Sequence, residues 1–372
     1  MSERATFDVA VVGLGPGGAS AARIAAQAGL RVFGCERNAV IGEPVQCAEF
    51  VPMPMLPYVH APGVRIQQIE AMKTGLPSGQ MVTSAFPGLM IDRGCFDRAI
   101  AARAEEAGAV LRAGLPLRRL EAGSGETVRL VCGPAGAETS IQARWVIAAD
   151  GPHSPVAACL GLPPLRTVQT RQYTVPLLTS YADTDIWLSD DYPGGYGWLF
   201  PKGSVANVGL GADRQFTRDL RTPLAALHRQ LIGEGLIGER ILGRTGGAIP
   251  VSGLRPRLWE GQAIFVGDAA GLTHPITGAG IAPAVVSGEA AGRAVVGVLG
   301  GDSGALVEYD EDMRDHFGPA LERALARRGE LDRVWHTPKA NDDATMRRGW
   351  IAFEEYFESS PRPPSQAVAA LS

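Results

Sequence analysis

The chain has 372 residues, of which 45% are hydrophobic and 20% charged, and its formal net charge is -4. This length and composition predict a globular protein with two lobes or one elaborated domain, and the small net charge gives no general attraction to nucleic acid. A transmembrane helix is not expected, because Glu289 and Arg293 interrupt the best apolar run.

The cysteines and the N-terminus indicate a cytoplasmic protein. Glu3 and Asp8 stand where a secretory signal would carry basic residues. The five cysteines are widely spaced and form no CxxC pair, which indicates reduced thiols rather than a disulfide framework or a zinc site. The histidines also lack the spacing of metal ligands, so no metal is expected. The cysteines are Cys35, Cys47, Cys95, Cys132 and Cys159.

The start of the chain has the pattern of a β-α-β unit. Residues 8–12 form a short valine-rich run typical of a buried strand, residues 19–28 form an alanine-rich helix that Gly29 ends, and residues 31–35 form a second strand. Parallel strands need a crossover connection, so this order predicts a doubly wound α/β domain.

The middle of the chain changes character. Seven prolines between residues 43 and 90 predict loops and short strands, and helical spacing returns at residues 96–108. Residues 145–149 and 264–266 are typical of further buried strands, and strand-like runs from about 163 to 249 predict a separate β-rich lobe. After residue 301 the tail is predicted to be helical to about residue 357.

A glycine-rich turn lies between the first strand and the first helix. In Gly13-x-Gly15-x-x-Gly18, the three glycines allow a tight turn, close approach of a pyrophosphate, and close packing of helix on strand. The helix N-terminus then presents free N–H groups to the phosphates. Glu36 ends the second strand, where a carboxylate accepts from a ribose hydroxyl. These residues predict a dinucleotide site.

Two later segments favour FAD over a nicotinamide cofactor. Asp150 and Asp268 each end a predicted strand, and a carboxylate at such a position is well placed to bind a ribityl hydroxyl. Gly280 and Ile281 begin a helix whose N–H groups would face the flavin O2. The alternative role for each aspartate is that of an ordinary cap or turn residue. Together with the glycine-rich turn, these segments resemble those that hold FAD in the p-hydroxybenzoate hydroxylase superfamily.

Three aromatic residues alternate in the segment from 193 to 203. Tyr196, Trp198 and Phe200 therefore share one face of a strand, which suits either core packing or an apolar substrate. The whole segment, with residues 206–211, is similar to the YxWxFP…GxG signature of the geranylgeranyl reductase family. The archaeal digeranylgeranylglycerophospholipid reductases are the most similar type.

Two more segments, residues 42–49 and 91–97, resemble that group, so the resemblance spans about residues 8 to 295 in five ordered motifs. It implies an α/β fold with a discontinuous, doubly wound, Rossmann-type FAD-binding domain, a β-rich substrate lobe and a helical C-terminal segment. The FAD-binding domain is expected in 1–60, 90–162 and 245–300, the substrate lobe in 61–89 and 163–244, and the C-terminal segment, with a disordered end, in 301–372.

The resemblance also implies roles for single residues. It places substrate-side roles on Tyr196, Trp198 and Phe200, and catalytic or substrate-side roles on Cys47 and Glu49. In an extended segment, residues two apart share a face, so both side chains are expected to border the flavin. FAD contacts are implied for Gly13, Gly15, Gly18, Glu36, Arg93, Asp268, Gly280 and Ile281, and the strand-end carboxylate adds Asp150. For Arg93 the alternative is a surface turn formed with Asp92.

The expected reaction is saturation of isoprenoid C=C bonds by hydride from N5 of reduced FAD, with a proton from Cys47 or water. Ala48 replaces a glycine of the group, and Ala157 stands where the wider superfamily often has arginine. The electron donor is therefore open between NAD(P)H and a protein such as a ferredoxin. Transient contact with the inner membrane surface is expected, since the substrate is a lipid.

Three other functions fit the residues. A flavin monooxygenase would consume oxygen with an aromatic substrate, whereas a dehydrogenase would pass electrons to a quinone or an electron-transfer partner. A non-catalytic flavin- or lipid-binding protein would bind FAD without turnover.

Overall fold

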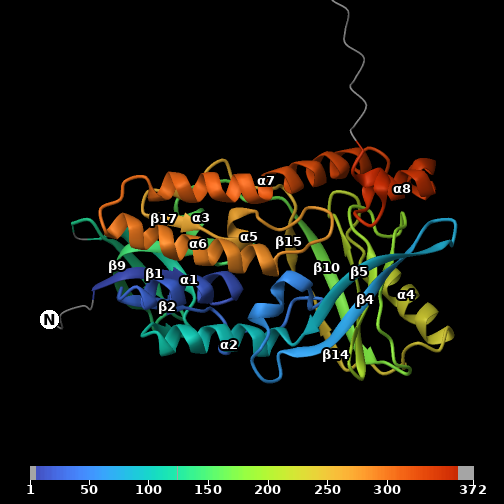
Figure 1. The fold of residues 1–372 in the computed structure, drawn as a ribbon, viewed down its shortest axis with the longest axis horizontal. Helices are drawn as coiled ribbons and strands as arrows, with labels where there is room; N and C mark the ends of the chain where they lie inside the picture. The colour runs from blue at the N-terminus through green and yellow to red at the C-terminus, as the bar shows by residue number, and fades with distance from the viewer. Residues whose placement is uncertain (1–5, 124, 359–372) are drawn as a thin grey trace, which may run out of the picture.

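The structure, a computed structural model, describes residues 6–123 and 125–358. Two β-sheets lie side by side along the long axis of the molecule, and helices cover one face of the first sheet (Figure 1). The predicted α/β class and the discontinuous FAD-binding domain are confirmed, because a mostly parallel sheet is built from three separate stretches of the chain.

The first sheet has the strand order β16-β17-β9-β1-β2-β6. Every pair of neighbouring strands from β17 to β6 is parallel. Strands β7 and β8 form an antiparallel extension that pairs with the long strand β9. The strands are β1 (Thr6–Val12), β2 (Val32–Cys35), β6 (Val110–Arg112), β7 (Leu117–Ala122), β8 (Val128–Cys132), β9 (Thr139–Ala148), β16 (Trp259–Glu260) and β17 (Ala263–Phe265).

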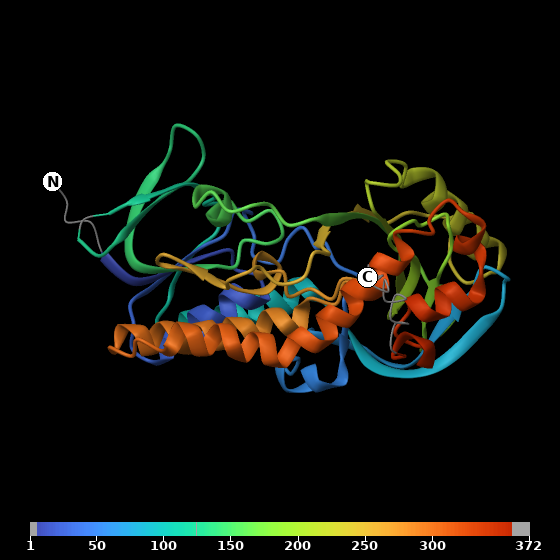
Figure 2. The same ribbon diagram turned by 90° about the horizontal axis from the view of Figure 1, so that it is seen from above.

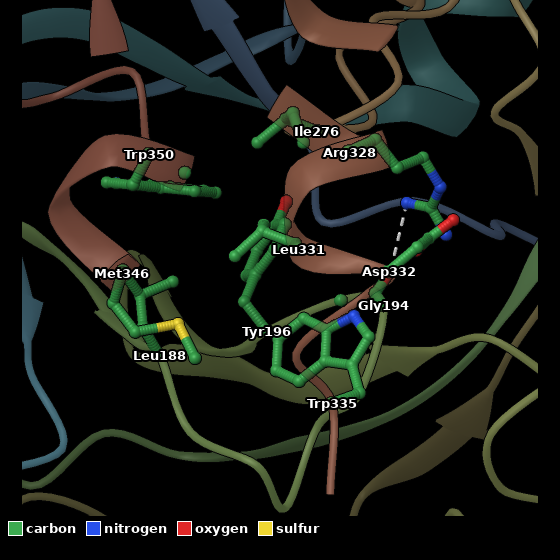
Figure 3. Close-up of a pocket in the computed structure, with 12 residues that line it drawn as sticks. Leu188, Gly194, Tyr196, Ile276, Arg328, Leu331, Asp332, Trp335, Met346 and Trp350 are labelled. Carbon is green, nitrogen blue, oxygen red and sulfur yellow. Dashed lines mark hydrogen bonds between the residues drawn. The ribbon is translucent and has the colours of Figure 1, made fainter. Parts of the chain in front are cut away.

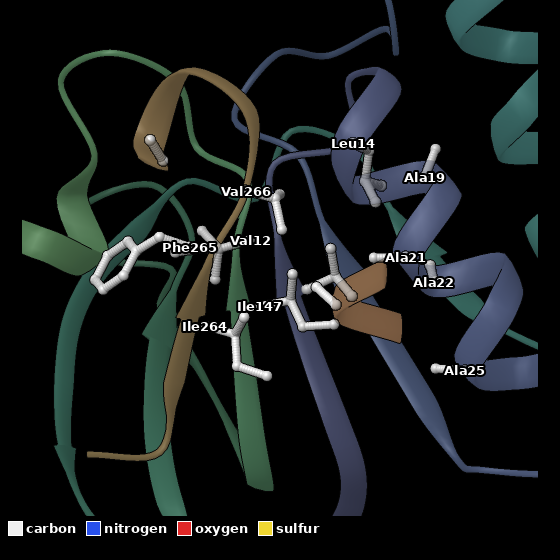
Figure 4. Packing of buried hydrophobic residues seen from close by; sticks show 14 of the residues in the cluster. Val12, Leu14, Ala19, Ala21, Ala22, Ala25, Ile147, Ile264, Phe265 and Val266 are labelled. Atoms are coloured by element: carbon white, nitrogen blue, oxygen red, sulfur yellow. The ribbon is translucent and has the colours of Figure 1, made fainter. Parts of the chain in front are cut away.

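The helices of this domain lie on one face of the sheet, and the β7–β8 hairpin lies on the other (Figure 2). They are α1 (Pro16–Gln27), α2 (Arg93–Glu106), α6 (Ile281–Leu299) and the long α7 (Ala305–Leu331), with the short α3 (Pro155–Cys159) and α5 (Gly267–Ala270) at strand ends. Small side chains of α1, such as Ala21 and Ala25, face the strands that carry Ile147 (Figure 4). Because these alanines are small, the helix packs close to the sheet.

Helix α6 is long and apolar enough to cross a membrane by length and composition alone. In the structure it packs tightly on α1: a Cβ atom on Gly288 would lie 2.1 Å from the carbonyl oxygen of Gly17, and one on Gly292 would lie 2.8 Å from Cβ of Ile24. Val285, with no exposed surface, is buried in the same core. This packing is that of a core helix.

The second sheet has the order β14-β10-β13-β12-β11-β4-β5-β3, and β15 pairs with β10. Helix α4 (Arg221–Gly233) packs on one face, with Leu224 and Leu231 in the same apolar cluster as Val208. The strands are β3 (Phe50–Pro52), β4 (Arg65–Gly75), β5 (Met81–Ile91), β10 (Thr167–Pro176), β11 (Thr184–Trp187), β12 (Gly197–Lys202), β13 (Val205–Ala212), β14 (Gly243–Thr245) and β15 (Ala248–Pro250).

Two details of this lobe differ from the sequence predictions. Strands β3 and β15 lie in ranges assigned to the FAD-binding domain, but they pair within the second sheet. The proline-rich region also forms two strands of 11 residues, β4 and β5, where short strands were expected. Pro87 is tolerated because it lies opposite a register shift between Ile69 and Ala71, where the ladder is already interrupted.

The C-terminal segment covers the other face of the second sheet. Helix α7 runs along the first domain to the second sheet, and it is followed by η2 (Pro338–Asn341), α8 (Asp343–Gly349) and η3 (Glu354–Tyr356). A further turn, η1 (Met53–Tyr58), follows β3. The predicted helical tail is therefore one long helix and three short ones. The predicted disordered end lies outside the described residues.

Candidate active site

The turn between β1 and α1 has the geometry of a phosphate-binding loop. Gly13 has φ +90°, and a Cβ atom there would lie 2.3 Å from the carbonyl oxygen of Ala149. A Cβ atom on Gly18 would lie 1.9 Å from the carbonyl oxygen of Gly13, so both positions require glycine. Gly15 is the N-cap of α1, whose N-terminus has no side-chain cap, and a Cβ atom on Gly15 would meet nothing within 4 Å. An anion therefore fits at this helix end.

Glu36 follows β2 and is 9% exposed. Its Oε2 atom accepts from the backbone N–H of Leu14 at 3.0 Å, and its Oε1 atom accepts from the backbone N–H of Asn38 at 2.9 Å. Each carboxylate oxygen can accept a second hydrogen bond, so Glu36 is held in place and keeps acceptor capacity for a ribose hydroxyl.

Asp268 and Gly280 lie together at the start of α5 and α6. The hydroxyl of Thr273 donates to Oδ1 of Asp268, and burial raises the pKa of Asp268. A Cβ atom on Gly280 would lie 3.1 Å from the same Oδ1 atom. Ile281, which is 9% exposed, begins α6 behind this glycine N-cap. The structure thus brings together the three residues that the sequence predicted here.

Asp150 follows β9 and lies against the phosphate-binding loop: a Cβ atom on Gly13 would be 3.0 Å from Cα of Asp150. Its Oδ2 atom accepts from the backbone N–H of Val156 at 2.8 Å, whereas its buried Oδ1 atom has no partner among the described residues. Burial raises the pKa of Asp150 to about 6. One oxygen therefore serves the turn, and the other is available to a cofactor hydroxyl.

Glu49 has a different setting from the one predicted. It has φ +73°, and residues 47–49 form no strand, so Cys47 and Glu49 do not alternate as in an extended segment. The buried carboxylate accepts from Lys202 Nζ at 2.8 and 2.9 Å, from Asn207 Nδ2 at 2.9 Å, and from the backbone N–H of Arg93 at 2.9 Å. With four hydrogen bonds, Glu49 joins the second sheet to the start of α2 and fixes the chain beside Cys47.

Arg93 begins α2, with Asp92 as its side-chain N-cap, so the two residues do not form a surface turn. The guanidinium of Arg93 donates to both carboxylate oxygens of Asp97, at 2.9 and 3.1 Å. Burial lowers the pKa of Arg93, but the Asp97 carboxylate outweighs it, so the pKa is raised and the side chain stays charged. This fixed cation lies beside Cys47, and its contact with FAD stays a prediction.

Cys47 is half-buried between the two sheets. Its Sγ atom accepts from the backbone N–H of Glu49 at 3.2 Å, and burial raises the pKa of the thiol although Arg93 opposes this. The side chain of Gln172 donates to the carbonyl oxygen of Cys47 at 3.1 Å and accepts from Nε1 of Trp198 at 3.1 Å. Gln172, which the sequence did not single out, thus fixes Cys47 relative to the aromatic residues.

Tyr196, Trp198 and Phe200 lie on one face of the second sheet, as predicted. Ring centroids are 5.7 Å apart for Tyr196 and Trp198, and 6.5 Å apart for Trp198 and Phe200. The hydroxyl of Tyr196 donates to the carbonyl oxygen of Thr277 at 2.6 Å, in the loop between Asp268 and Gly280. We call these three residues the aromatic wall, and it is joined directly to the loop predicted to hold the flavin.

The C-terminal segment covers this wall, a contribution that the sequence reasoning missed. Trp350 lies 4.8 Å from Tyr196, measured between ring centroids, and Trp335, Met346 and Phe353 belong to the same buried cluster. The hydroxyl oxygen of Tyr356 also lies 3.4 Å from Nε2 of His274, in the loop between Asp268 and Gly280. The aromatic residues of the tail were the available signal, but nothing local in the sequence says which sheet they cover.

Three kinds of comparison with known proteins agree. A family described as FAD binding domain matches residues 88–215. Digeranylgeranylglycerophospholipid reductases from Methanocella arvoryzae and Methanocaldococcus jannaschii are 33% and 34% identical, over 86% and 78% of this chain and the same shares of their own length. The crystal structure of a geranylgeranyl bacteriochlorophyll reductase-like protein from Thermoplasma acidophilum superposes with a TM-score of 0.83 at 26% identity, covering 94% of this chain and 92% of that one.

Proposed function

We propose, from the premise that this chain belongs to the family of digeranylgeranylglycerophospholipid reductases, that it uses FAD to saturate carbon–carbon double bonds of an isoprenoid lipid. The hydrogen bond between Tyr196 and the carbonyl oxygen of Thr277 carries the proposal. It fixes an apolar wall, suited to a hydrocarbon chain, against the loop that lies between two predicted FAD contacts, Asp268 and Gly280.

FAD, when bound and reduced, would supply the hydride for one alkene carbon from its N5 atom. The chain must supply the rest: an isolated alkene is a poor hydride acceptor, so positioning and exclusion of water are needed. The aromatic wall and its C-terminal cover provide a dry, shaped surface. The Cys47 thiol holds a proton on Sγ, since its raised pKa keeps it neutral, and this proton is the one we assign to the second alkene carbon.

Replacing Cys47 with alanine is expected to slow the transfer of hydrogen from reduced FAD to the lipid, because a positioned proton donor contributes roughly 10²-fold or more to such steps. FAD content is expected to stay normal. The measurement is anaerobic single turnover of the dithionite-reduced holoprotein with a geranylgeranyl lipid, and Cys159→Ala, at an exposed thiol, is the matched control. Full turnover by Cys47→Ala would remove Cys47 from the mechanism and leave water as the proton source.

Trp198→Phe is expected to weaken lipid binding while leaving FAD binding near normal, because the indole donates to Gln172 and spans the middle of the wall. Phenylalanine also presents a smaller apolar surface to the lipid, and the loss of about 1 kcal/mol of apolar contact corresponds to roughly a fivefold rise in the lipid Kd. Trp187→Phe is the control, since Trp187 lies on β11 and packs against the opposite face of the same sheet. Equal loss of lipid and FAD binding would assign Trp198 to folding alone.

We also propose that electrons come from NAD(P)H or from a protein donor such as a ferredoxin, and that the protein is cytoplasmic with transient contact at the inner membrane surface. Five free cysteines favour a reducing compartment. Ala157 lies buried in α3 and offers no charge to a nicotinamide phosphate, which favours a protein donor. Reduction of the flavin by NADPH at a catalytically useful rate would identify the nucleotide, rather than a protein, as the electron donor.

The function itself is tested anaerobically. The purified holoprotein is reduced with dithionite, a geranylgeranyl lipid is added, and the flavin absorbance and product mass are followed. Reoxidation of the flavin together with addition of hydrogen pairs to the lipid is the expected result. A flavin that stays reduced until air is admitted would contradict the proposal and favour an oxygen-coupled enzyme.

A further inference from the structure

Arg328 links helix α7 to three other segments of the chain. It lies near the C-terminal end of the helix and is only 5% exposed. Its Nη1 atom donates to the carbonyl oxygen of Gly194 at 3.0 Å (Figure 3) and to that of Pro275 at 3.1 Å. Its Nη2 atom donates to Oδ2 of Asp213 at 2.9 Å. Three segments that are far apart in the sequence therefore meet at one guanidinium group.

Two of these acceptors belong to the segments predicted to hold the substrate and the flavin. Gly194 lies just before Tyr196, the first residue of the aromatic wall, and Pro275 lies in the loop between α5 and α6, which we call the flavin-side loop. The wall and the loop also touch directly, through the hydrogen bond from Tyr196 to Thr277. Arg328 thus adds a second link between them, made from the C-terminal segment.

The flavin-side loop is a compact turn that leads directly into α6. The backbone N–H of His274 donates to the carbonyl oxygen of Ala279 at 3.1 Å, and that of Gly278 donates to the carbonyl oxygen of His274 at 2.9 Å. Gly280, the N-cap of α6, has no side chain to cap the first N–H groups of the helix. A shift of the Pro275 carbonyl would therefore carry the turn with it, and also the helix N-terminus predicted to face the flavin O2.

Arg328 is not the only cation beside Asp213. Arg166 donates to the same Oδ2 atom from Nη2 at 2.7 Å and from Nε at 3.1 Å. Asp213 therefore keeps a charged partner when Arg328 is replaced. Such a replacement also removes the bonds to the two backbone carbonyls, which lose a buried donor. The effect of Arg328 on the loop can thus be separated from its part in the ion pairs.

We propose that Arg328 is a positioning residue for hydride transfer, which holds the flavin-side loop at a fixed distance from the aromatic wall. Reacting groups that are misplaced by about 1 Å can lose roughly 10²-fold in rate. The N–H groups at the start of α6 would stabilise the negative charge that the flavin gains on reduction, so a displaced loop also lowers the flavin potential. The inference rests on the proposed function for the lipid at the wall, and it adds a residue of the C-terminal segment that sets the reaction geometry.

The test compares three variants of the holoprotein. Arg328→Met removes the bonds to both carbonyl groups. Arg328→Lys keeps a charge beside Asp213 but lacks the planar fork that reaches three acceptors. Arg166→Met is the matched control, because the side chain of Arg166 pairs with Asp213 and Asp332 instead of with the flavin-side loop.

The midpoint potential of the bound flavin is measured anaerobically against a reference dye, and the transfer of hydrogen to a geranylgeranyl lipid is followed in a single turnover. In both Arg328 variants, reduced FAD should lose roughly tenfold in affinity relative to oxidised FAD, which lowers a two-electron potential by about 30 mV. The single-turnover rate should fall roughly tenfold or more. Arg166→Met should keep both values, and urea denaturation reports the stability of each variant separately.

An unaltered potential and rate in either Arg328 variant would overturn the inference. An equal fall of the potential in Arg166→Met would overturn it too, because the effect would then come from the ion pairs in general. If Arg328→Met does not fold, Arg328→Lys alone decides. Lipid reduction that neither Arg328 variant slows would sink the inference and leave the proposed function intact. A lowered potential in a protein that reduces no lipid would contradict the proposed function, while the effect of Arg328 on the flavin would stand.

Discussion

Gly18→Ala is expected to abolish stable FAD binding and to destabilise the protein. The new Cβ atom would lie 1.9 Å from the carbonyl oxygen of Gly13 and 2.9 Å from Cβ of Ala149, so helix α1 must move away from the turn. Such overpacking costs about 1–3 kcal/mol of stability. The N–H groups at the start of α1 move with the helix, and we expect the FAD Kd to rise by roughly tenfold or more.

Gly15→Ala separates these two effects. Its Cβ atom meets nothing within 4 Å in the protein alone, so the apoprotein should keep its stability within about 0.5 kcal/mol. The same atom points into the space beside the helix N-terminus, where the pyrophosphate is predicted, and FAD affinity should fall. Gly233→Ala, which also meets nothing within 4 Å, is the control with normal FAD binding. Flavin absorbance after gel filtration and urea denaturation are the measurements. Normal FAD affinity in Gly15→Ala would place the pyrophosphate elsewhere.

The first domain could be predicted well because its signals are local. Gly18 has a steric reason that acts within the turn, because its Cβ atom would lie 1.9 Å from the carbonyl oxygen of Gly13, and Asp268 and Gly280 meet at the starts of α5 and α6. The period-two pattern of Tyr196, Trp198 and Phe200 likewise fixes a shared face once the strand is known. In these places the local chemistry and the fold agree.

The setting of Glu49 and the cover over the aromatic wall depend on contacts between residues far apart in the chain, which local patterns do not predict. Glu49 was predicted from local spacing to border the flavin, but Lys202 and Asn207, more than 150 positions away, hold its carboxylate. Its positive φ also breaks the alternation on which the prediction relied. The cover formed by Trp335 and Trp350 is a similar case, since its place is set by α7, which carries the chain from one sheet to the other.

Lys202→Met is expected to destabilise the holoprotein by about 3–5 kcal/mol, the cost of leaving a buried carboxylate without its cation. The side chains of Lys202 and Glu49 are 17% and 5% exposed. Burial lowers the pKa of Lys202, but the Glu49 and Asp92 carboxylates outweigh it and raise the pKa, so the residue is charged in the folded protein. The free energy of unfolding from urea denaturation is the measurement.

The effect should extend to the active site, because Lys202 lies at the end of β12 and links Glu49 to Asp92, the N-cap of α2. Adding Glu49→Gln to Lys202→Met removes the unpaired charge and should recover part of the lost stability. Arg119→Met breaks a pair at the surface and should stay close to the original protein. Lys202→Met would prove no more destabilising than Arg119→Met only if the ion pair with Lys202 did not hold Glu49. In that case a direct role of Glu49 beside Cys47 would explain better why Glu49 lies there.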